Sequence, residues 1–187
     1  MTLKEAIYTT VKEIVQTALI SLGIFLFVYV FLIQPHKVQG VSMEPAFENA
    51  ELLLTEKISY RVSRVQRGDV VVFAAPVDKK VDFIKRIIGL PGENIEIKDH
   101  RVYINGLKLD EPYISIPTTG DTNLTIGNDE FFVLGDNRGA SSDSRSFGPI
   151  KRKSIKGKVW LVYWPIVKSQ NFAGARIFSH VYYSIPD

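Results

Sequence analysis

An uncharged run of 20 residues near the N-terminus, Ile14 to Ile33, constrains the fold of this chain more than any other feature. As a helix, about 20 residues cover a hydrocarbon core of about 30 Å. The run is longer than the apolar core of a typical signal peptide, and it lacks the polar face of a soluble amphipathic helix. We therefore predict a transmembrane helix over 14–33, preceded by a short N-terminal segment over 1–13.

Two questions about this run stay open from the sequence alone. Val38 and Gly40 are small residues of the kind that a processing site places at its third and first positions, although uncleaved anchoring is the interpretation we adopt. The flanking charges do not fix the orientation, because the lysines before the run are accompanied by glutamates while Lys37 follows it.

The rest of the chain, 34–187, contains short β-branched and aromatic runs separated by turn residues. Asp99-His100 and Asn105-Gly106 are typical of hairpin turns. This pattern predicts one predominantly antiparallel β-sheet or barrel-like domain on a single helical anchor. The expected strands cover Asp69 to Phe73, Val81 to Gly89, Asn94 to Lys98, Arg101 to Ile104, Glu130 to Gly135 and Lys158 to Trp164.

Several kinds of site are excluded or disfavoured by composition. The chain has no cysteine, which rules out disulfides, thiolate nucleophiles and cysteine-ligated metals. His36, His100 and His180 lie far apart without ligand-like spacing, so we predict solvated surface histidines, and no metal or cofactor. The net charge of +3 is compatible with an anionic surface but demands none, and we expect no nucleic-acid partner.

Ser42 lies in the segment Gly-Val-Ser-Met-Glu-Pro, just beyond the predicted membrane exit. Gly40 permits unusual backbone angles there, and such a turn can present a hydroxyl group. The same composition is also typical of ordinary turns, so the serine needs a partner before it indicates catalysis. With no histidine in an evident triad, a lysine base is the remaining candidate.

Lys85 has the surroundings that a lysine base requires. A lysine acts as a base near neutral pH only if desolvation lowers its pKa by roughly 3 units. In a strand over Val81 to Gly89, Lys85 shares a face with Val81, Phe83 and Ile87, whereas Arg86 lies on the opposite face. The pattern predicts a buried amine, although a snorkelling side chain or a shifted register would fit it as well.

A third polar cluster occupies Gly135 to Pro149, directly after an apolar strand. Its glycines, small hydroxyls and alternating charges fit either an ordered polar loop or a solvated surface loop. In an ordered loop, Asp143 forms a charge-assisted pair with Arg138 or Arg145.

These motifs, in this order after a membrane span, closely resemble those of type I signal peptidases in their compact Gram-positive form. The resemblance covers nearly the whole chain. The four matching boxes are Ser42 to Phe47, Arg67 to Phe73, Lys85 to Glu93 and Gly135 to Arg145.

The resemblance implies a role for each matching residue. Ser42 is then the nucleophile, Lys85 the general base and Ser141 the hydroxyl that orients the lysine, with Asp143 and Arg145 as structural supports. The backbone N–H of Ser42 contributes to the oxyanion hole. The second donor of the family stands at the position of Gly40, which has no side chain to supply it.

The resemblance also implies a substrate and a location. The enzyme would remove signal peptides from exported preproteins, with its catalytic domain on the outer face of the cytoplasmic membrane and 1–13 in the cytoplasm. Its partners would be signal peptides, the lipid bilayer and nearby secretion machinery. The basic stretch Lys151 to Lys158 is interpreted as a solvated charge run, with contact to anionic lipid head groups as the alternative.

Two other functions remain candidates from the sequence. A self-cleaving serine/lysine repressor would share the chemistry, although the membrane span argues against it. A membrane-tethered, non-enzymatic peptide-binding β-domain would leave Ser42 and Lys85 as bystanders.

Overall fold

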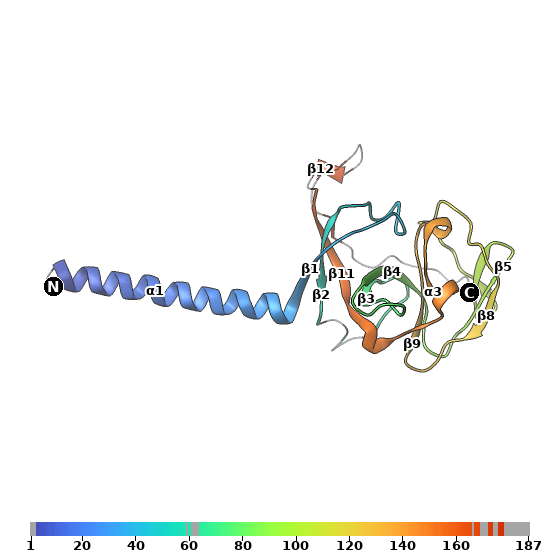
Figure 1. Cartoon of the computed structure of the whole chain (residues 1–187), viewed down its shortest axis with the longest axis horizontal. Coiled ribbons are helices and arrows are strands. Elements are labelled where there is room, and N and C mark those ends of the chain that lie inside the picture. The colour runs from blue at the N-terminus through green and yellow to red at the C-terminus, as the bar shows by residue number, and fades with distance from the viewer. Residues whose placement is uncertain are drawn as a thin grey trace.

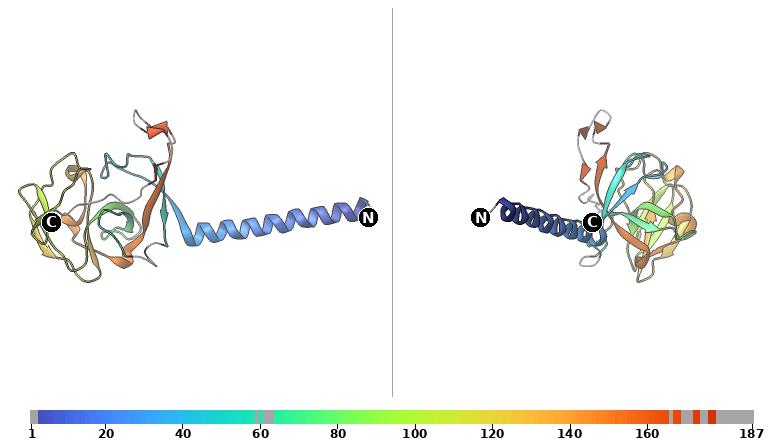
Figure 2. Two further views of the ribbon diagram at one scale, coloured as in Figure 1. Left: turned by 180° about the vertical axis from the view of Figure 1, so that it is seen from behind. Right: turned by 60° about the vertical axis from the view of Figure 1, so that its left-hand side comes forward.

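A long N-terminal helix and a β domain make up the computed structural model, which describes residues 3–58, 60, 64–165, 167–168, 172–173 and 176–177. Figure 1 shows the helix projecting from one side of the domain, and both views in Figure 2 show the same separation. The helix α1 covers Leu3–Phe27 and continues as a π-helical turn, η1, over Val28–Leu32. This arrangement confirms the predicted fold class of a mainly antiparallel β domain behind one apolar helix.

The boundaries of the helix differ from the prediction. It begins at Leu3 instead of residue 14, so most of the segment 1–13 is helical. At its other end Ile33 is the first residue of strand β1. The part long and apolar enough to cross a membrane is Ile7–Phe27. The rest of the protein does not bury its apolar stretch.

The main sheet is antiparallel, with the strand order β1-β2-β11-β3-β4-β9-β10 and β14 also paired to β11. A second sheet has the order β7-β6-β5-β8, and β12 pairs with β13. The strands of the main sheet are β1 (Ile33–Lys37), β2 (Leu52–Glu56), β3 (Val70–Ala74), β4 (Asp82–Gly89), β9 (Glu130–Leu134), β10 (Ile150–Lys151), β11 (Ile155–Trp164) and β14 (Arg176–Ile177). The others are β5 (Asn94–Lys98), β6 (Arg101–Ile104), β7 (Leu107–Lys108), β8 (Thr122–Thr125), β12 (Val167–Lys168) and β13 (Phe172–Ala173).

The predicted hairpin turns join β5 to β6 and β6 to β7. All four of their central residues have positive φ, at 49° for Asp99, 61° for His100, 51° for Asn105 and 84° for Gly106. Such angles favour Asn, Asp and Gly and give the turn a twist that matches the strands. The turn residues therefore fix the register of β5 and β6, which cover the predicted ranges.

Three apolar clusters hold the domain together. One lies between the second sheet and the ends of β4 and β9, and includes Ile95 and Phe132. Another contains Met43 and Phe47 from the turn after β1, and a third contains Val71, Phe73 and Ile87. Val38, which precedes Ser42, belongs to the same cluster as Met43 and Phe47, so the turn is attached to the core on both sides of the serine.

Strand β4 lies between β3 and β9 and is buried from Lys85 to its end. Arg86 is only 2% exposed although the alternation placed it opposite the apolar face. Both faces of this half of the strand are therefore buried. Arg86 is buried because its guanidinium pairs with buried Asp136 and donates to the carbonyl of Gly68.

Candidate active site

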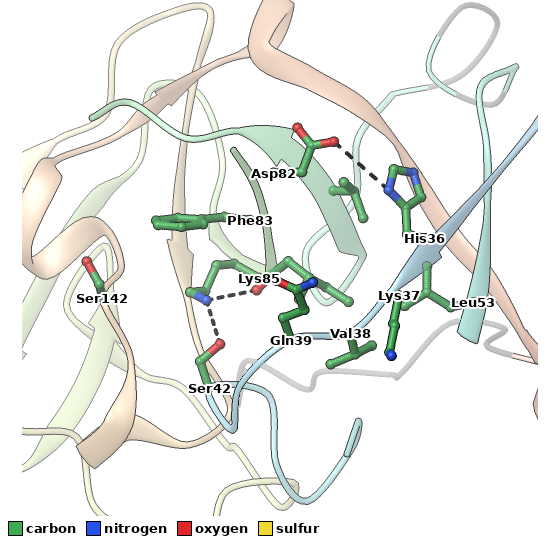
Figure 3. A pocket seen from close by; sticks show the side chains of 12 residues that line it. His36, Lys37, Val38, Gln39, Ser42, Leu53, Asp82, Phe83, Lys85 and Ser142 are labelled. Carbon is green, nitrogen blue, oxygen red and sulfur yellow. Dashed lines mark hydrogen bonds and ion pairs between the residues drawn. The ribbon is translucent and has the colours of Figure 1, made fainter. Parts of the chain in front are cut away.

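Ser42 and Lys85 lie 43 positions apart in the sequence and meet in the structure. The Nζ of Lys85 lies 2.7 Å from the Oγ of Ser42 and donates a second bond of 2.9 Å to the carbonyl of Ile84. The ring centroid of Phe83 lies 5.4 Å from the same nitrogen. Figure 3 shows the lysine reaching across the groove to the serine.

The turn that carries Ser42 is shaped by its neighbours. Gly40 has a φ of +90°, a conformation that suits glycine, and its N–H donates to Oδ1 of Asn49. Beyond the serine, Met43 and Phe47 are 1% and 0% exposed. The buried side chains of Met43 and Phe47 and the positive φ of Gly40 therefore hold the Ser42 hydroxyl at the edge of the core.

Burial changes the chemistry of Lys85. The side chain is nearly inaccessible, and desolvation lowers the pKa of Lys85 from 10.5 to about 8, while Asp143 and Asp136 act in the opposite direction. A fraction of about one tenth is then unprotonated at pH 7. The shift has the direction and nearly the size that the sequence argument required of a lysine base.

The loop after β9 lies against the turn that carries Ser42. The N–H of Asn137 donates to the carbonyl of Ser42, and the side-chain amide of Asn137 donates to the carbonyl of Val41. Gly135 approaches so closely that a Cβ there would lie 2.5 Å from the Ser42 carbonyl oxygen and from the Cβ of Ser141. The loop is therefore ordered, and it packs where a larger residue than glycine would not fit.

Asp143 and Arg145 hold this loop, as the sequence predicts for one of two possible pairs. Arg145 donates to both carboxylate oxygens of Asp143 at 2.8 Å, and also to the carbonyls of Thr119 and Arg138. Asp143 in turn accepts from the N–H of Gly135 and caps helix α3, Ser144–Phe147.

Arg138 takes a different partner from the one considered. Its guanidinium binds Glu111 and Thr118, which lie between β7 and β8, and its Nε donates to the carbonyl of Gly135. Glu111 has no motif around it in the sequence, so only the tertiary structure reveals that the second sheet supports this loop.

Ser141 does not make the expected bond to Lys85 in this structure. Its Oγ is buried and has no hydrogen-bond partner among the described residues. Leaving such a group unpaired costs about 1–3 kcal/mol. The hydroxyl lies beside Gly135, at the back of the site.

A groove of about 230 Å³ lies beside Ser42 and Lys85 (Figure 3). Most of its walls come from the residues before Ser42 and from the strand that carries Lys85, and Leu53, Val72 and Ser142 complete them. The lining residues are His36, Lys37, Val38, Gln39, Ser42, Leu53, Val72, Asp82, Phe83, Ile84, Lys85 and Ser142.

His36 lies at the far end of this groove and is not the solvated histidine that the sequence predicts. Its side chain is 13% exposed, its Nε2 lies 3.1 Å from Oγ1 of Thr55, and its Nδ1 lies 4.0 Å from a carboxylate oxygen of Asp82. Burial lowers the pKa of His36. His100 is exposed as predicted, and His180 lies outside the described residues.

Comparisons with known proteins identify a peptidase family. The family profile described as "Signal peptidase, peptidase S26" matches residues 11–164. Signal peptidase I of Bacillus caldolyticus is 41% identical over 152 residues, which cover 72% of this chain and 81% of that protein. Signal peptidase IB of Staphylococcus aureus strain COL is 32% identical over 176 residues, covering 82% and 91% respectively.

A crystal structure of a signal peptidase I from Enterococcus faecalis is also similar. It shares 36% sequence identity and a TM-score of 0.48, and the match covers 52% of this chain and 97% of that one. The sequence matches favour the peptidase interpretation over the self-cleaving repressor and over the non-enzymatic binding domain.

Proposed function

Because the chain belongs to the signal peptidase family S26 and is a signal peptide-removing peptidase, we propose that Ser42 is its nucleophile and Lys85 its general base. The observation that carries this proposal is the contact of 2.7 Å between Ser42 Oγ and a buried lysine amine. A base within hydrogen-bond reach of a hydroxyl can accept its proton as the hydroxyl attacks. Among the described residues, Lys85 is the only lysine that has a lowered pKa and also contacts a serine hydroxyl.

The reaction proceeds in two steps. The neutral amine of Lys85 accepts the proton of Ser42 while Oγ attacks the scissile carbonyl, and the resulting ammonium returns a proton to the leaving amine. A water molecule, deprotonated by Lys85, then attacks the acyl carbonyl; the bond from that carbon to Oγ breaks, and the ammonium of Lys85 returns the proton to Ser42. The chemistry uses no metal or cofactor at any step.

The oxyanion that forms during attack needs donors close to Ser42. We assign the first donor to the backbone N–H of Ser42. The second donor of the family belongs to the position that Gly40 occupies in this chain. Gly40 offers no side chain, and its N–H is already bonded to Asn49. The second donor is then a backbone group or a water molecule, or the oxyanion is held more weakly; loss of one such donor costs about 3 kcal/mol in other enzymes.

Ser141, Asp143 and Arg145 support the lysine in this proposal. The unpaired hydroxyl of Ser141 gains a partner when it turns toward Lys85, and the pair of Asp143 and Arg145 keeps its loop in place. Because Asp143 opposes the lowering of the lysine pKa, its distance from Lys85 also affects how much free amine is present.

The groove accommodates an extended peptide beside Ser42. Val38, Leu53, Val72 and Ile84 supply apolar lining. A groove of about 230 Å³ suits a peptide with small side chains before the cut. We propose the signal peptides of exported preproteins as its substrates, with secretion machinery nearby.

The helix α1 is the proposed anchor, with its N-terminal end on the cytoplasmic side and the catalytic domain of 34–187 on the outer face. The 21 residues of Ile7–Phe27 rise about 32 Å, which matches a hydrocarbon core. Tethering keeps Ser42, ten residues beyond the last helical residue Leu32, near the surface where a signal peptide leaves the bilayer.

The test is cleavage of a preprotein with small residues at its processing site. Detergent-purified wild type is compared with Ser42→Ala and Lys85→Ala, and mass spectrometry locates the cut. Cleavage at that site by the wild type alone supports both assignments. Full activity in a folded Ser42→Ala variant would refute the nucleophile.

A further inference from the structure

A second groove, which we call the basic groove, is separate from the groove that contains Ser42. It has a volume of about 420 Å³. Four of its eight lining residues are cationic and only one is a carboxylate. The lining residues are Lys57, Tyr60, Val65, Asp129, Arg152, Lys153, Ile155 and Lys156.

The basic groove lies at the end of the sheet where the helix enters the domain. The N–H of Lys57 donates to the carbonyl of Leu32, the last helical residue, at 3.0 Å. Ile33 pairs with Glu56, which also pairs with Lys158 on β11. In Figure 1 the start of β11 and the end of β2 lie on the side of the domain that faces α1. A bilayer crossed by α1 would therefore bring its head groups to this side.

The cations of the groove are partly fixed and partly available. Arg152 is held by a bond from its Nη2 to the carbonyl of Tyr60 and from its N–H to the carbonyl of Asp129. Lys156 pairs with Asp82 at 2.6 Å. Lys153 is exposed and has no ion pair among the described residues. A positioned guanidinium beside lysine ammonium groups is the donor set that binds phosphate oxygens.

We propose that the basic groove binds the phosphate head group of an anionic lipid in the leaflet next to the catalytic domain. The inference rests on the proposed membrane anchoring by α1, but not on the catalytic assignments. The polar region of a bilayer adds several ångströms beyond each side of the hydrocarbon core. Lys57, which is bonded to the last helical residue Leu32, therefore lies at the depth of the head groups. The carboxylates nearby are Asp129, Asp82, Glu56 and Asp69, of which Asp69 pairs with Lys158. With Lys158 added to the four lining cations, five positive charges face four negative ones, so the surroundings keep a net charge of +1.

Binding there would also connect the lipid to the catalytic groove. Lys156 lines the basic groove and its Nζ contacts Asp82, which lines the groove of Ser42. A bound head group would hold the domain at a defined orientation on the bilayer, with the catalytic groove on the same sheet. The lipid site is thus one residue contact away from the substrate path.

Native mass spectrometry of the full chain in detergent tests this proposal. Phosphatidylglycerol or phosphatidylcholine is titrated against the wild type, a Lys57→Gln/Lys153→Gln variant, the single variant Lys153→Gln, and Lys108→Gln. Lys108 lies on β7 of the second sheet and is exposed, so its substitution removes the same charge elsewhere.

We expect phosphatidylglycerol to bind the wild type more tightly than phosphatidylcholine. Each lysine near a membrane surface contributes about a fivefold gain in affinity for anionic lipid, so the double variant should bind about 25-fold more weakly and Lys153→Gln about fivefold more weakly. Lys108→Gln should match the wild type. Unchanged phosphatidylglycerol affinity in both folded groove variants would overturn the proposal.

Two further arms separate the possible failures. Inorganic phosphate that displaces phosphatidylglycerol at equal concentration would assign the groove to a soluble phosphate and refute the lipid source. Flotation of the wild type with pure phosphatidylcholine vesicles tests the anchor without the groove, and failure to float would refute the anchoring on which the lipid site depends.

Discussion

Replacement of Lys85 by methionine should remove activity. It should also remove the pH-dependent free-energy cost of burying the Lys85 ammonium. Burial lowers the pKa of Lys85 from 10.5 to about 8 in the folded protein. In the unfolded chain the same amine returns to its ordinary pKa. Methionine has a similar length and no charge, so it keeps the packing while it removes the buried ammonium.

The sign follows from proton binding. Between pH 8 and pH 10.5 the unfolded wild type binds more protons at Lys85 than the folded protein does, so wild-type stability rises with pH in this window. Below pH 8 the full cost of burying the charge is present. The two pKa values make the wild type gain about 2.5 kcal/mol relative to Lys85→Met between pH 7 and pH 10. Loss of the bonds from Lys85 to Ser42 and Ile84 changes the free energy of unfolding of the variant by a similar amount at every pH, so it affects the pH dependence less.

Urea unfolding of the full chain in detergent measures this difference, with the fluorescence of Trp160 and Trp164 on β11 as the signal. The variant Lys108→Met is the control, because this exposed lysine on β7 should leave the pH dependence as in the wild type. Other titrating groups are common to all three proteins and cancel in the comparison. A difference between Lys85→Met and wild type that is the same at pH 7 and pH 10 would refute the argument that Lys85 is buried at a cost.

Three further predictions concern activity and the catalytic loop. The specificity constant kcat/KM for preprotein cleavage should rise about tenfold per pH unit up to about pH 8 and then level off, because the neutral amine of Lys85 is the active form; a flat profile from pH 6 to pH 8 would contradict this. Gly135→Ala should lower the cleavage rate by at least about 100-fold by displacing Ser42, whereas Gly139→Ala, whose nearest neighbour would be 3.9 Å away, should keep it within a few fold. Glu111→Ala should lower the free energy of unfolding by about 3 kcal/mol, measured by urea unfolding, since it leaves the buried guanidinium of Arg138 without its carboxylate, and an unchanged midpoint would exclude this role.

Local patterns were sufficient for strands β5 and β6 and for singling out Lys85, whereas β7 and β8 were not among the expected strands and the pattern around Ser42 was that of an ordinary turn. The strands β5 and β6 were predictable because alternating side chains and two turns with positive φ agree on one register. Lys85 was identifiable because a charged residue stood on an apolar face, which is rare unless the charge is shifted or paired. Its contact with Ser42 was expected only from the resemblance to signal peptidases, since no local pattern predicts which serine lies opposite a strand.

The features that the sequence did not predict depend on distant partners or on weak boundary signals. Arg86 is buried by Asp136, 50 positions away, and Arg138 binds Glu111 from another sheet. The helix α1 extends back to Leu3, and Lys4, Glu5, Lys12 and Glu13 in this extension are good helix formers, whereas the prediction used the uncharged run alone. The partial burial of His36 requires the contact of β1 with β2, which a count of histidines cannot show.

Acylation of the folded full chain by a serine-directed acylating inhibitor tests the central claim, that Ser42 reacts through Lys85. Intact-mass measurement gives the extent of labelling and peptide mapping gives its position, for the wild type and for Lys85→Ala. The account predicts one adduct on Ser42 in the wild type and none in the lysine variant under the same conditions. Labelling of Ser42 at the same rate in both proteins, or an adduct on another residue, would contradict it.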